Sequence, residues 1–403
     1  MNALPTLRIG IDATEAGITN GERGGVYQYI RQLIRHVGAA SPDSELQLMF
    51  ALPHYRHTST IRQFVAGFDC QNVVSRRCPL PIRYLRRWRI PVDLFLGRID
   101  VFHAPAHLGL RCRASPVVVT VHDLSYLRDR GGESAPTELE PHERRRWEMR
   151  REFFAEIAER IEESVRAARL VIAVSGATRD DLVAAFGIAS AKVRVVHLGV
   201  RDGIRHVEAD ACVAVTTPYG LRTPYWLYVG GLDPNKNLVT MLEGYAHYRR
   251  QGGKRALAIA GHSAFYGTVL RHRAKKLGIE DDVVFLGYVP DAHLPALYSA
   301  ATAVVMPSPL EGFGLPALEA MACGTPVIAA GAGALPEVVG DAGLLVEASD
   351  ARQFAEAMQR LDDDWALRAD LGAAGMRRST QFSWERAALE TLGVYAEAAG
   401  RQR

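Results

Sequence analysis

The chain has 403 residues, more than one ordinary hydrophobic core holds, so we predict two domains of about 150–200 residues each. Hydrophobic residues make up 48 % and charged residues 23 %, as in soluble globular proteins, and a net charge of +3 gives no support for a nucleic-acid-binding protein. Five cysteines without a CxxC pair argue against a disulfide framework or a zinc site, and with no signal region and no apolar membrane span we expect a cytoplasmic protein.

Short β-branched runs alternate with amphipathic segments of helical length along the whole chain. Several of these runs are apolar on both faces, as parallel strands covered by helices on each side must be. We therefore predict an α/β fold with doubly wound sheets, whose ligands bind at the carboxyl ends of the strands. The predicted strands are residues 7–13, 45–52, 100–105, 116–123, 169–175 and 192–200, then 225–231, 256–261, 283–288, 303–308, 326–331 and 343–347. Mixed polarity and turn residues at 201–224 indicate an inter-domain linker.

The loop after the first predicted strand carries Gly24 and Gly25 ahead of a helical pattern. Glycines at a helix start let the backbone approach a ligand closely. Neither the dinucleotide fingerprint GxGxxG nor the Walker pattern GxxxxGK[ST] occurs in the sequence. His122 stands at the carboxyl end of strand 116–123, where it can donate to a substrate oxygen. A loop histidine with its hydrogen bonds satisfied is the alternative.

Residues 228–238, YVGGLDPNKNL, combine a strand end at Gly230 with an Asp-Pro turn and a lysine at a helix start. Lys236 there opposes the helix dipole unless an anion binds beside it. Lysine is a point-charge partner for phosphate, so this segment predicts a phosphate contact. The alternative is a surface lysine in an ordinary turn.

The stretch 310–331, LEGFGLPALEAMACGTPVIAAG, reads as a turn followed by a helix with Pro316 in its first turn. The backbone N–H groups of Phe313, Gly314 and Leu315 would then lie at a positive helix end, which is a ready anion site.

Two glutamates flank this turn. Glu319 lies about a turn and a half into the helix, where it can accept hydrogen bonds from sugar hydroxyls. Glu311 lies on the turn side, where a second sugar attached to the phosphates could lie. The alternative is a pair of exposed acids around a core helix.

Together these segments resemble the retaining GT-B glycosyltransferases of family four, which use nucleotide-sugar donors. The resemblance rests on the two glutamates separated by seven residues in EGFGLPALE, the lysine turn GLDPNKN, the glycine loop GGV, the histidine of VHD, and the text of 333–350. It implies two Rossmann-like domains facing across a cleft. Residues 1–205 would bind the acceptor, residues 206–382 the donor, and helix 383–403 would cross back to the N-terminal domain.

The same resemblance implies roles for single residues. The expected catalytic residues are Lys236 at the diphosphate, Glu311 over the donor sugar and His122 against the transferred sugar. The expected donor-binding residues are Gly24 and Gly25 over the phosphates, Gly230 at the strand end, Phe313, Gly314 and Leu315 through backbone N–H, Glu319 at the ribose, and Val289 with Asp291 at the base.

One departure from the family concerns the arginine that many members carry five residues before the lysine; here that position is Gly231. Diphosphate binding would then depend more on Lys236 and the helix N-terminus. We expect no cofactor and no metal site, and we interpret the acidic LDDDW at 361–365 as a solvated turn.

Residues 76–91, RRCPLPIRYLRRWRIP, contain six arginines and no acid, interleaved with aromatic and aliphatic residues. Such a segment predicts contact with an anionic membrane surface, which would bring a polyprenyl-diphosphate-linked acceptor to the cleft. A solvated helix or an oligomer contact is the alternative. A second basic run, 143–154, contains three glutamates and is more typical of a solvated helix face.

The sequence thus predicts transfer of a hexose, with mannose first, from a nucleotide diphosphate sugar to a sugar or lipid-linked saccharide. GDP-mannose is the first expected donor and a UDP-sugar the second, and the pathway would be polysaccharide or lipopolysaccharide assembly. The alternatives are a nucleotide-sugar 2-epimerase on the same fold and a non-catalytic sugar-nucleotide-binding protein.

Overall fold

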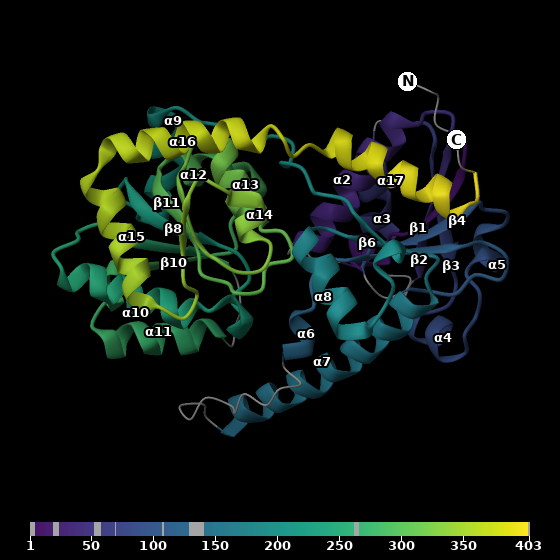
Figure 1. Ribbon diagram of the computed structural model, residues 1–403, viewed down its shortest axis with the longest axis horizontal. Helices are drawn as coiled ribbons and strands as arrows, with labels where there is room; N and C mark the ends of the chain where they lie inside the picture. Colours follow the sequence, from purple (N-terminus) through teal and green to yellow (C-terminus); the bar gives the residue numbers. More distant parts are fainter. Residues whose placement is uncertain are drawn as a thin grey trace. The chain divides into compact units, whose positions relative to one another are not determined.

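The computed structural model describes residues 5–18, 24–51, 58–68, 70–106, 109–128, 141–261 and 266–401 (Figure 1). The chain forms two compact units. The first comprises residues 1–133, 149–199 and 383–403, and the second comprises residues 134–148 and 200–382.

The first unit is built on a parallel sheet of seven strands in the order β3-β2-β1-β4-β5-β6-β7. The strands are β1 (Arg8–Asp12), β2 (Glu45–Ala51), β3 (Val73–Cys78), β4 (Val101–Ala104), β5 (Val117–Val121), β6 (Leu170–Ala173) and β7 (Val193–Val195). The strand order reverses between β1 and β4, which are neighbours in the sheet. In doubly wound folds this reversal opens a crevice for ligands at the carboxyl ends of the strands.

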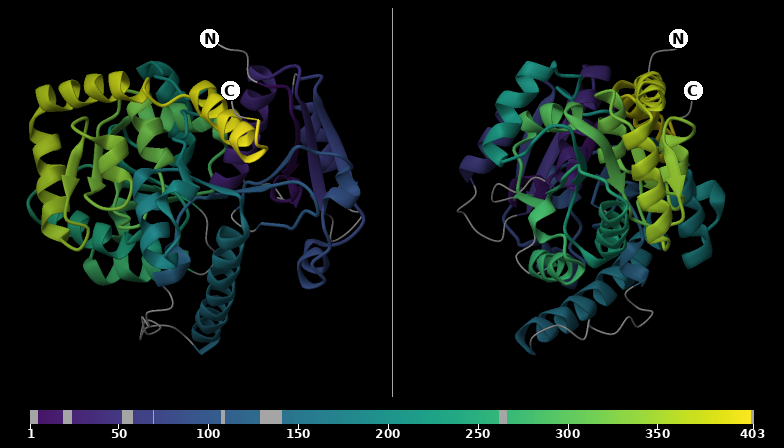
Figure 2. Two further views of the ribbon diagram at one scale, coloured as in Figure 1. Left: turned by 45° about the vertical axis from the view of Figure 1, so that its right-hand side comes forward. Right: turned by 90° about the vertical axis from the view of Figure 1, so that its left-hand side faces the viewer.

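Helices cover both faces of this sheet. The helices are α1 (Thr14–Ile18), α2 (Gly25–Ala40), α3 (Thr58–Ala66), α4 (Ile82–Arg87), α5 (Asp93–Leu96), α6 (Ser125–Arg128), α7 (Pro141–Ala167), α8 (Gly176–Phe186) and α17 (Trp384–Ala398). The C-terminal α17 packs against α2, and Ser383 caps it as its sequence predicts (Figure 1). On the other face α4, α5, α7 and α8 contribute Leu85, Leu96, Ile161 and Leu182 to one apolar core with the strands. Figure 2 shows α7 as a long single helix.

The second unit has a parallel sheet of six strands in the order β10-β9-β8-β11-β12-β13. The strands are β8 (Tyr225–Val229), β9 (Leu257–Ala260), β10 (Val283–Gly287), β11 (Ala301–Met306), β12 (Val327–Ala330) and β13 (Leu344–Val346). Here the order reverses between β8 and β11. In this fold a ligand binds at such a reversal, so we expect a second ligand crevice at the carboxyl ends of β8 and β11.

Two helical layers enclose this second sheet (Figure 1). The first contains α10 (Leu238–Arg250), α11 (Tyr266–Leu277) and α15 (Ala351–Asp363), which pack Leu242 and Phe354 into the core. The second contains α9 (Ala209–Thr216), α12 (Leu294–Ser299), α13 (Leu315–Ala322), α14 (Leu335–Val339) and α16 (Trp365–Ser379).

The predicted α/β fold with two doubly wound parallel sheets is confirmed, and each predicted strand is present. One strand, one helix and one acidic segment differ from the expectations. Strand β3 was not predicted, because Arg76 and Arg77 are exposed on an edge strand that lacks an apolar face. Helix α9 lies inside the segment expected to be a linker.

The interpretation of 361–365 as a solvated turn is wrong. Asp362 makes a partly buried ion pair with Arg255 and accepts a hydrogen bond from the hydroxyl of Tyr248. Asp364 caps α16 by accepting a hydrogen bond from the N–H of Leu367 at 2.9 Å. Asp362 thus joins α15 to distant residues, and no local sequence pattern indicates these contacts.

Candidate functional site

Lys236 and Glu311 meet at the strand-order reversal of the second unit. Lys236 ends the 3₁₀ turn Pro234–Lys236 after β8, and Glu311 follows the neighbouring strand β11. The Lys236 Nζ donates to Glu311 Oε1 at 2.7 Å. Both side chains are only partly buried, with 26 % and 13 % of their surface exposed, so they remain within reach of a ligand.

The turn that carries Lys236 is held rigidly beside β11. The side-chain amide of Asn237 donates to the carbonyl oxygens of Pro307 at 3.0 Å and of Ala348 at 2.7 Å. The backbone of Asn237 is left-handed, with φ of 55°. Asp233 caps the turn by accepting from the N–H of Asn235. Lys236 therefore lies in a turn that hydrogen bonds hold at the carboxyl edge of the sheet.

Helix α13 begins at the same edge. Gly314 precedes it with φ of 91° and ψ of 47°, a conformation that favours glycine, and a Cβ there would lie 2.8 Å from Leu335 Cδ2. Pro316 lies in the first turn, and Phe313 is buried against Phe382 with ring centroids 5.7 Å apart. The first N–H groups of α13, including Leu315, have no acceptor within their own helix, which makes this end attractive for an anion.

Glu319 is nearly fully buried, at 1 % exposure, inside a polar cluster. Arg201 contacts both carboxylate oxygens, with its Nη2 donating to Oε2 at 2.7 Å, and the Tyr298 hydroxyl donates to the same oxygen at 2.9 Å. Arg201 Nη1 also donates to Asp291 Oδ1 at 3.0 Å. The ribose role of Glu319 stays a prediction.

Arg201 is the residue that sequence reasoning missed. Burial acts to lower the pKa of Arg201, but the Glu319 carboxylate outweighs it and raises that pKa. A buried bidentate arginine–carboxylate pair is a strong, geometrically specific contact. The available signal was an arginine directly after HLGV, residues 197–200, which follow β7; we expected the stretch that it begins to be only a linker.

In the first unit, His122 follows β5, and its Nε2 lies 2.8 Å from the carbonyl oxygen of Pro105. A carbonyl only accepts, so Nε2 carries the proton and donates. Burial lowers the pKa of His122, against smaller opposing effects of Pro105 and Asp123, so the ring is neutral at neutral pH. Its Nδ1 is then an acceptor, suited to a sugar hydroxyl rather than to protonating a leaving group.

A buried hydrogen-bonded chain supports His122. Its ring packs edge-on against Tyr29 at 4.7 Å, and the Tyr29 hydroxyl lies 2.9 Å from Thr120 Oγ1. His103 Nε2 lies 2.7 Å from the same Thr120 oxygen, and its Nδ1 lies 2.6 Å from the Tyr395 hydroxyl of α17. Burial lowers the pKa of His103 to about 3. His103 is thus a neutral structural histidine that fixes the wall behind His122.

The remaining predicted residues lie at loop positions of the two units. Gly24 is the N-terminal cap of α2, and a Cβ on Gly24 or Gly25 would meet nothing within 4 Å. Gly230 directly follows β8, Val289 is buried after β10, and Asp291 begins the 3₁₀ turn Asp291–His293.

The structure thus brings together two groups within the second unit, Lys236 with Glu311 and Glu319 with Asp291 through Arg201. His122 and the Gly24-Gly25 pair belong to the first unit. Among the residues that the structure describes, no cluster of three or more His, Cys, Asp or Glu side chains is placed to hold a metal ion.

Family models match two segments of the chain. Residues 23–202 match the model described as Glycosyltransferase Family 4, and residues 220–378 match the model described as Glycosyl transferases group 1. These segments contain every predicted site residue from Gly24 to Glu319.

Curated relatives match over nearly the full length. O-antigen chain mannosyltransferase B of Escherichia coli is 33 % identical over 383 residues, which is 92 % of this chain and 95 % of the relative. D-inositol 3-phosphate glycosyltransferase of Acidothermus cellulolyticus is 28 % identical over 95 % of this chain and 88 % of its own length.

Solved structures share the fold. The Anabaena protein HepE, crystallised with UDP and glucose, superposes with a TM-score of 0.70 over 96 % of this chain and 99 % of its own, at 18 % identity. At that identity the likeness concerns the fold alone.

Proposed function

The chain belongs to the GT-B glycosyltransferases of family 4, and we propose that it transfers a hexose from a nucleotide diphosphate sugar to a glycan acceptor with retention at the anomeric carbon. The single observation that carries the site assignment is the Lys236–Glu311 pair at the β8/β11 reversal, next to the start of α13. It joins an ammonium, a carboxylate and a helix N-terminus in the crevice where this fold binds ligands.

Each group has a distinct task in this reaction. The departing nucleoside diphosphate gains negative charge as the bond to the anomeric carbon breaks, and Lys236 with the first N–H groups of α13 stabilises that charge. Glu311 pairs with Lys236 until the diphosphate binds, and then orients the ammonium and accepts from a donor-sugar hydroxyl. His122, neutral and protonated on Nε2, accepts a hydrogen bond from the transferred sugar through Nδ1.

Mannose from GDP-mannose is the first donor we propose, and glucose from UDP-glucose the second. Support for mannose is the name of the E. coli relative, a mannosyltransferase of O-antigen chains. Support for a uridine nucleotide is the UDP found with HepE. The proposed acceptor is a sugar or a polyprenyl-diphosphate-linked saccharide in surface polysaccharide assembly.

Release of nucleoside diphosphate by the purified protein tests this proposal. We expect release from GDP-mannose that depends on added acceptor, together with a product one hexose larger by mass spectrometry. A 2-epimerase would convert the nucleotide sugar into its epimer without an acceptor, and a non-catalytic binding protein would leave the donor unchanged; either result would refute the proposal.

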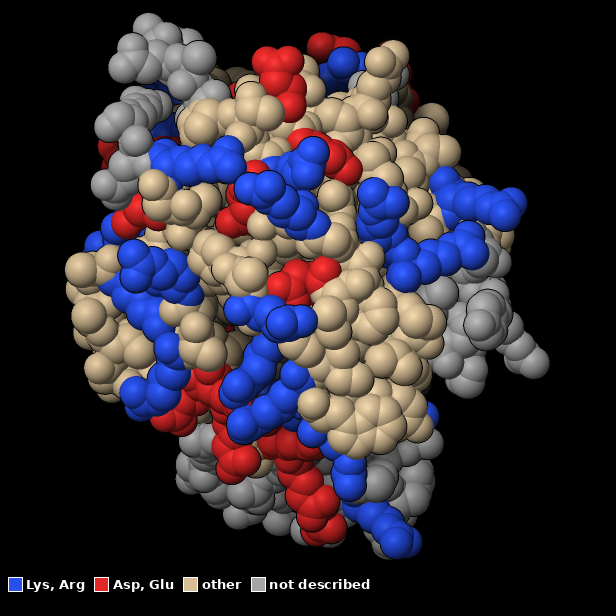
Figure 3. All heavy atoms as spheres, turned by 90° about the vertical axis from the view of Figure 1, so that its right-hand side faces the viewer, with Lys and Arg blue, Asp and Glu red and all other residues tan. Residues whose placement is uncertain are grey.

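We also propose peripheral contact between an anionic membrane and the exposed part of the basic segment 76–91. Within the segment Trp88 is 60 % exposed, and Arg83 and Arg87 are exposed as well. Figure 3 shows one face of the molecule, on which Lys and Arg side chains lie together with Asp and Glu side chains. None of the described helices is both long and apolar enough to cross a bilayer.

Flotation with anionic liposomes tests the membrane contact. We expect salt-sensitive flotation that the exposed-residue variant R83E/R87E/W88A loses. Equal flotation with neutral and anionic liposomes, or an unaffected triple variant, would contradict it.

A further inference from the structure

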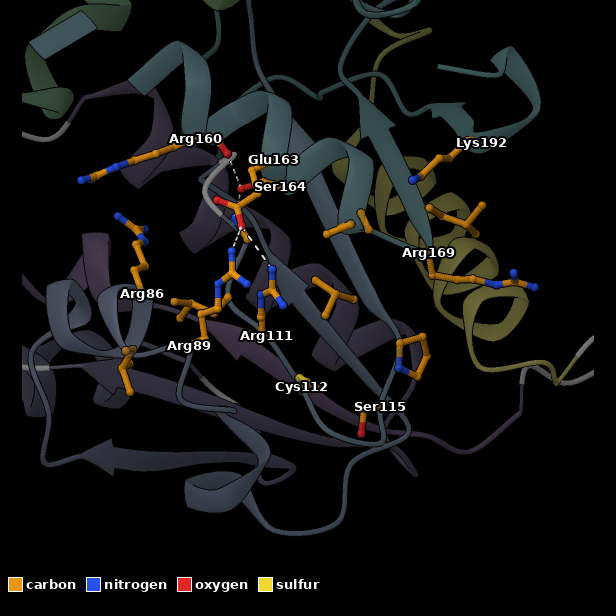
Figure 4. Close-up of a pocket in the computed structure, with 18 of the residues that line it drawn as sticks. Arg86, Arg89, Arg111, Cys112, Ser115, Arg160, Glu163, Ser164, Arg169 and Lys192 are labelled. Atoms are coloured by element: carbon orange, nitrogen blue, oxygen red, sulfur yellow. Dashed lines mark hydrogen bonds and ion pairs between the residues drawn. The ribbon is translucent and has the colours of Figure 1, made fainter. Parts of the chain in front are cut away.

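A large cavity of about 1780 Å³ lies wholly within the first unit, between α4 and the C-terminal half of α7 (Figure 4). One end is lined by Arg86 of α4 and Arg160 of α7, and the other by residues that precede β5, β6 and β7, including Ser115, Arg169 and Lys192. We call this cavity the α4–α7 groove.

The groove is strongly basic. Its lining includes eight cationic side chains but only two acidic ones, Glu163 and Glu397. Glu397 is already engaged by Arg194 in an ion pair. The cationic residues are Arg83, Arg86, Arg87, Arg89, Arg111, Arg160, Arg169 and Lys192.

Arg86 is half-buried in the groove and its hydrogen bonding is incomplete. Its Nε is buried and makes no hydrogen bond with the residues that the structure describes. Burial and the positive charge of Arg160 lower the pKa of Arg86, while Asp12 and Glu15 oppose this. A buried donor without an acceptor is costly, and an anion between the two arginines would satisfy it and relieve their repulsion.

Arg160 and Arg86 approach one another in Figure 4, from facing helices. Arg160 also contacts Glu156 one helical turn earlier, but that pair is exposed, a class that contributes little free energy. The guanidinium has five donors, so this contact leaves others for a ligand.

A second pair of arginines shares one carboxylate further along. Arg111 Nη2 lies 3.2 Å and Arg89 Nη2 3.6 Å from the same Glu163 Oε1 (Figure 4). Arg89 has a left-handed backbone, with φ of 50°, which turns it back toward α7. One carboxylate does not neutralise two guanidinium groups, so positive charge remains here as well.

One end of the groove, at Arg86, lies near the edge of the sheet at which its strands end, whereas Ser115, Arg169 and Lys192 at the other end precede their strands. The electrostatic partner of Arg86 is Asp12, the last residue of β1, and β1 neighbours β4 at the strand-order reversal of this unit. His122 bonds to Pro105, the residue after β4, at the same edge. The Arg86 end of the groove therefore lies toward this reversal, although Asp12, Pro105 and His122 do not line the groove.

We propose that the α4–α7 groove binds the phosphate or diphosphate of the glycosyl acceptor, with Arg86 and Arg160 as its principal ligands. The volume exceeds what a diphosphate alone fills, so the groove also has room for the chain or saccharide attached to it. This inference rests on the proposed function only in calling the ligand an acceptor; the anion site itself follows from the groove.

Calorimetric titration of the full-length protein with inorganic diphosphate tests the anion site. Because Lys236 offers a second place for diphosphate, the variants are chosen to separate the two sites. We expect R86Q/R160Q to weaken groove binding at least about tenfold, since two charge-assisted contacts are lost. K236A and the matched control R62Q, on exposed α3, should retain it. Unchanged binding in R86Q/R160Q would overturn the proposal.

A variant that should bind diphosphate more tightly complements R86Q/R160Q, because misfolding can explain a loss of binding but not a gain. Glu163 is exposed, so E163Q should preserve the fold while freeing Arg89 and Arg111. We expect diphosphate affinity to rise about two- to threefold, with stronger salt dependence. Weaker binding in E163Q would contradict the electrostatic account.

Two further ligands, geranyl diphosphate and geraniol, identify the source of the anion. Geranyl diphosphate binding more tightly than inorganic diphosphate supports a lipid-linked acceptor, and equal affinity supports a water-soluble phosphorylated one. Geraniol binding as tightly as geranyl diphosphate would overturn the proposal.

Kinetics complete the test once an acceptor is known. R86Q/R160Q should raise the acceptor KM at least about tenfold and leave the donor KM unchanged, because neither arginine is among the residues proposed to bind the donor. If wild-type protein shows no transfer while R86Q/R160Q still loses diphosphate binding, the proposed function fails and the anion site stands.

Discussion

At the residue scale, Glu319 and Arg201 form a buried pair whose members depend on each other. Glu319 is 1 % exposed and the Arg201 side chain 12 %. Removing one partner of such a pair leaves an uncompensated buried charge, which costs about 3–5 kcal/mol.

We therefore expect R201M to lower the free energy of unfolding of the second unit by about 3–5 kcal/mol, and the double variant R201M/E319Q to recover part of that loss. Urea unfolding followed by circular dichroism measures both. If R201M is as stable as wild type, the Arg201–Glu319 pair contributes little to the free energy of unfolding.

His103 makes stability depend on pH. Its pKa is about 3 when folded, against about 6.5 in an unfolded chain, so between these values the unfolded state binds the extra proton. Unfolding is then favoured as pH falls. We expect the free energy of unfolding to drop by about 1.4 kcal/mol per pH unit below pH 6.5 from His103, with His122 acting in the same direction.

Substitution by glutamine keeps a hydrogen-bonding side chain and removes the titration. Between pH 6.5 and 4, the slope of the free energy of unfolding against pH should be lower in H103Q than in wild type, by the amount that corresponds to about one proton taken up on unfolding. The control H272Q alters an exposed histidine of α11 and should leave the slope unchanged. Equal slopes in H103Q and wild type would mean that His103 titrates normally in the folded protein.

At the element scale, the segment after β12 holds Glu311 in place. The N–H of Ala334 donates to the Glu311 carbonyl at 2.9 Å, and Gly333 has φ of 59°. A Cβ on Gly333 would lie 2.9 Å from the oxygen and 3.0 Å from the nitrogen of the Glu311 backbone. Gly333 is thus a positioning residue for Glu311.

We expect G333A to reduce kcat about tenfold or more, because it displaces Glu311 as well as straining its own backbone. The control G278A has the same kind of positive φ, 70°, but its Cβ would meet nothing within 4 Å. Steady-state kinetics should show full activity in G278A. Comparable losses in both variants would point to general destabilisation instead.

The elements also show where sequence reasoning succeeds. Strands such as β8 and β11 are apolar on both faces and bounded by Gly or Pro, so their existence follows from local pattern. The turn at Lys236 and the start of α13 follow from local turn chemistry as well. Strand β3 carries arginines on its exposed side and gives no such signal.

What local pattern misses are contacts between distant segments. Arg201 and Glu319 are 118 positions apart, and Lys236 and Glu311 75 apart. Lys236 and Glu311 were both predicted to lie at the donor site because each belongs to a recognisable motif, although their contact was not predicted. Arg201 belongs to no such motif. The α4–α7 groove likewise depends on how two helices pack, which the arginine run alone does not specify.

At the scale of the whole molecule, the second unit carries Lys236, Glu311 and Glu319 of the proposed donor site, and the first carries His122 and the basic groove. A ligand that binds only the folded state stabilises it by mass action, by about 2.7 kcal/mol at a hundred times its dissociation constant. The nucleotide that fits the donor unit should therefore raise the melting temperature most.

In a thermal-shift comparison of GDP, UDP, ADP and dTDP, we expect the largest shift with GDP, and a smaller shift with GDP in K236A. A larger shift with UDP would replace the first proposed donor by the second. Shifts of the same size in K236A and wild type would remove Lys236 from the diphosphate site.

The central claim is that Lys236, paired with Glu311 at the β8/β11 reversal, stabilises the departing nucleoside diphosphate during glycosyl transfer. Its most direct test is kcat for transfer in K236A beside K254A, which alters an exposed lysine in the loop before β9. We predict a loss of roughly 10²–10³-fold in K236A, as for other groups that stabilise developing charge, and none in K254A. Transfer by K236A at close to the wild-type rate would contradict the account.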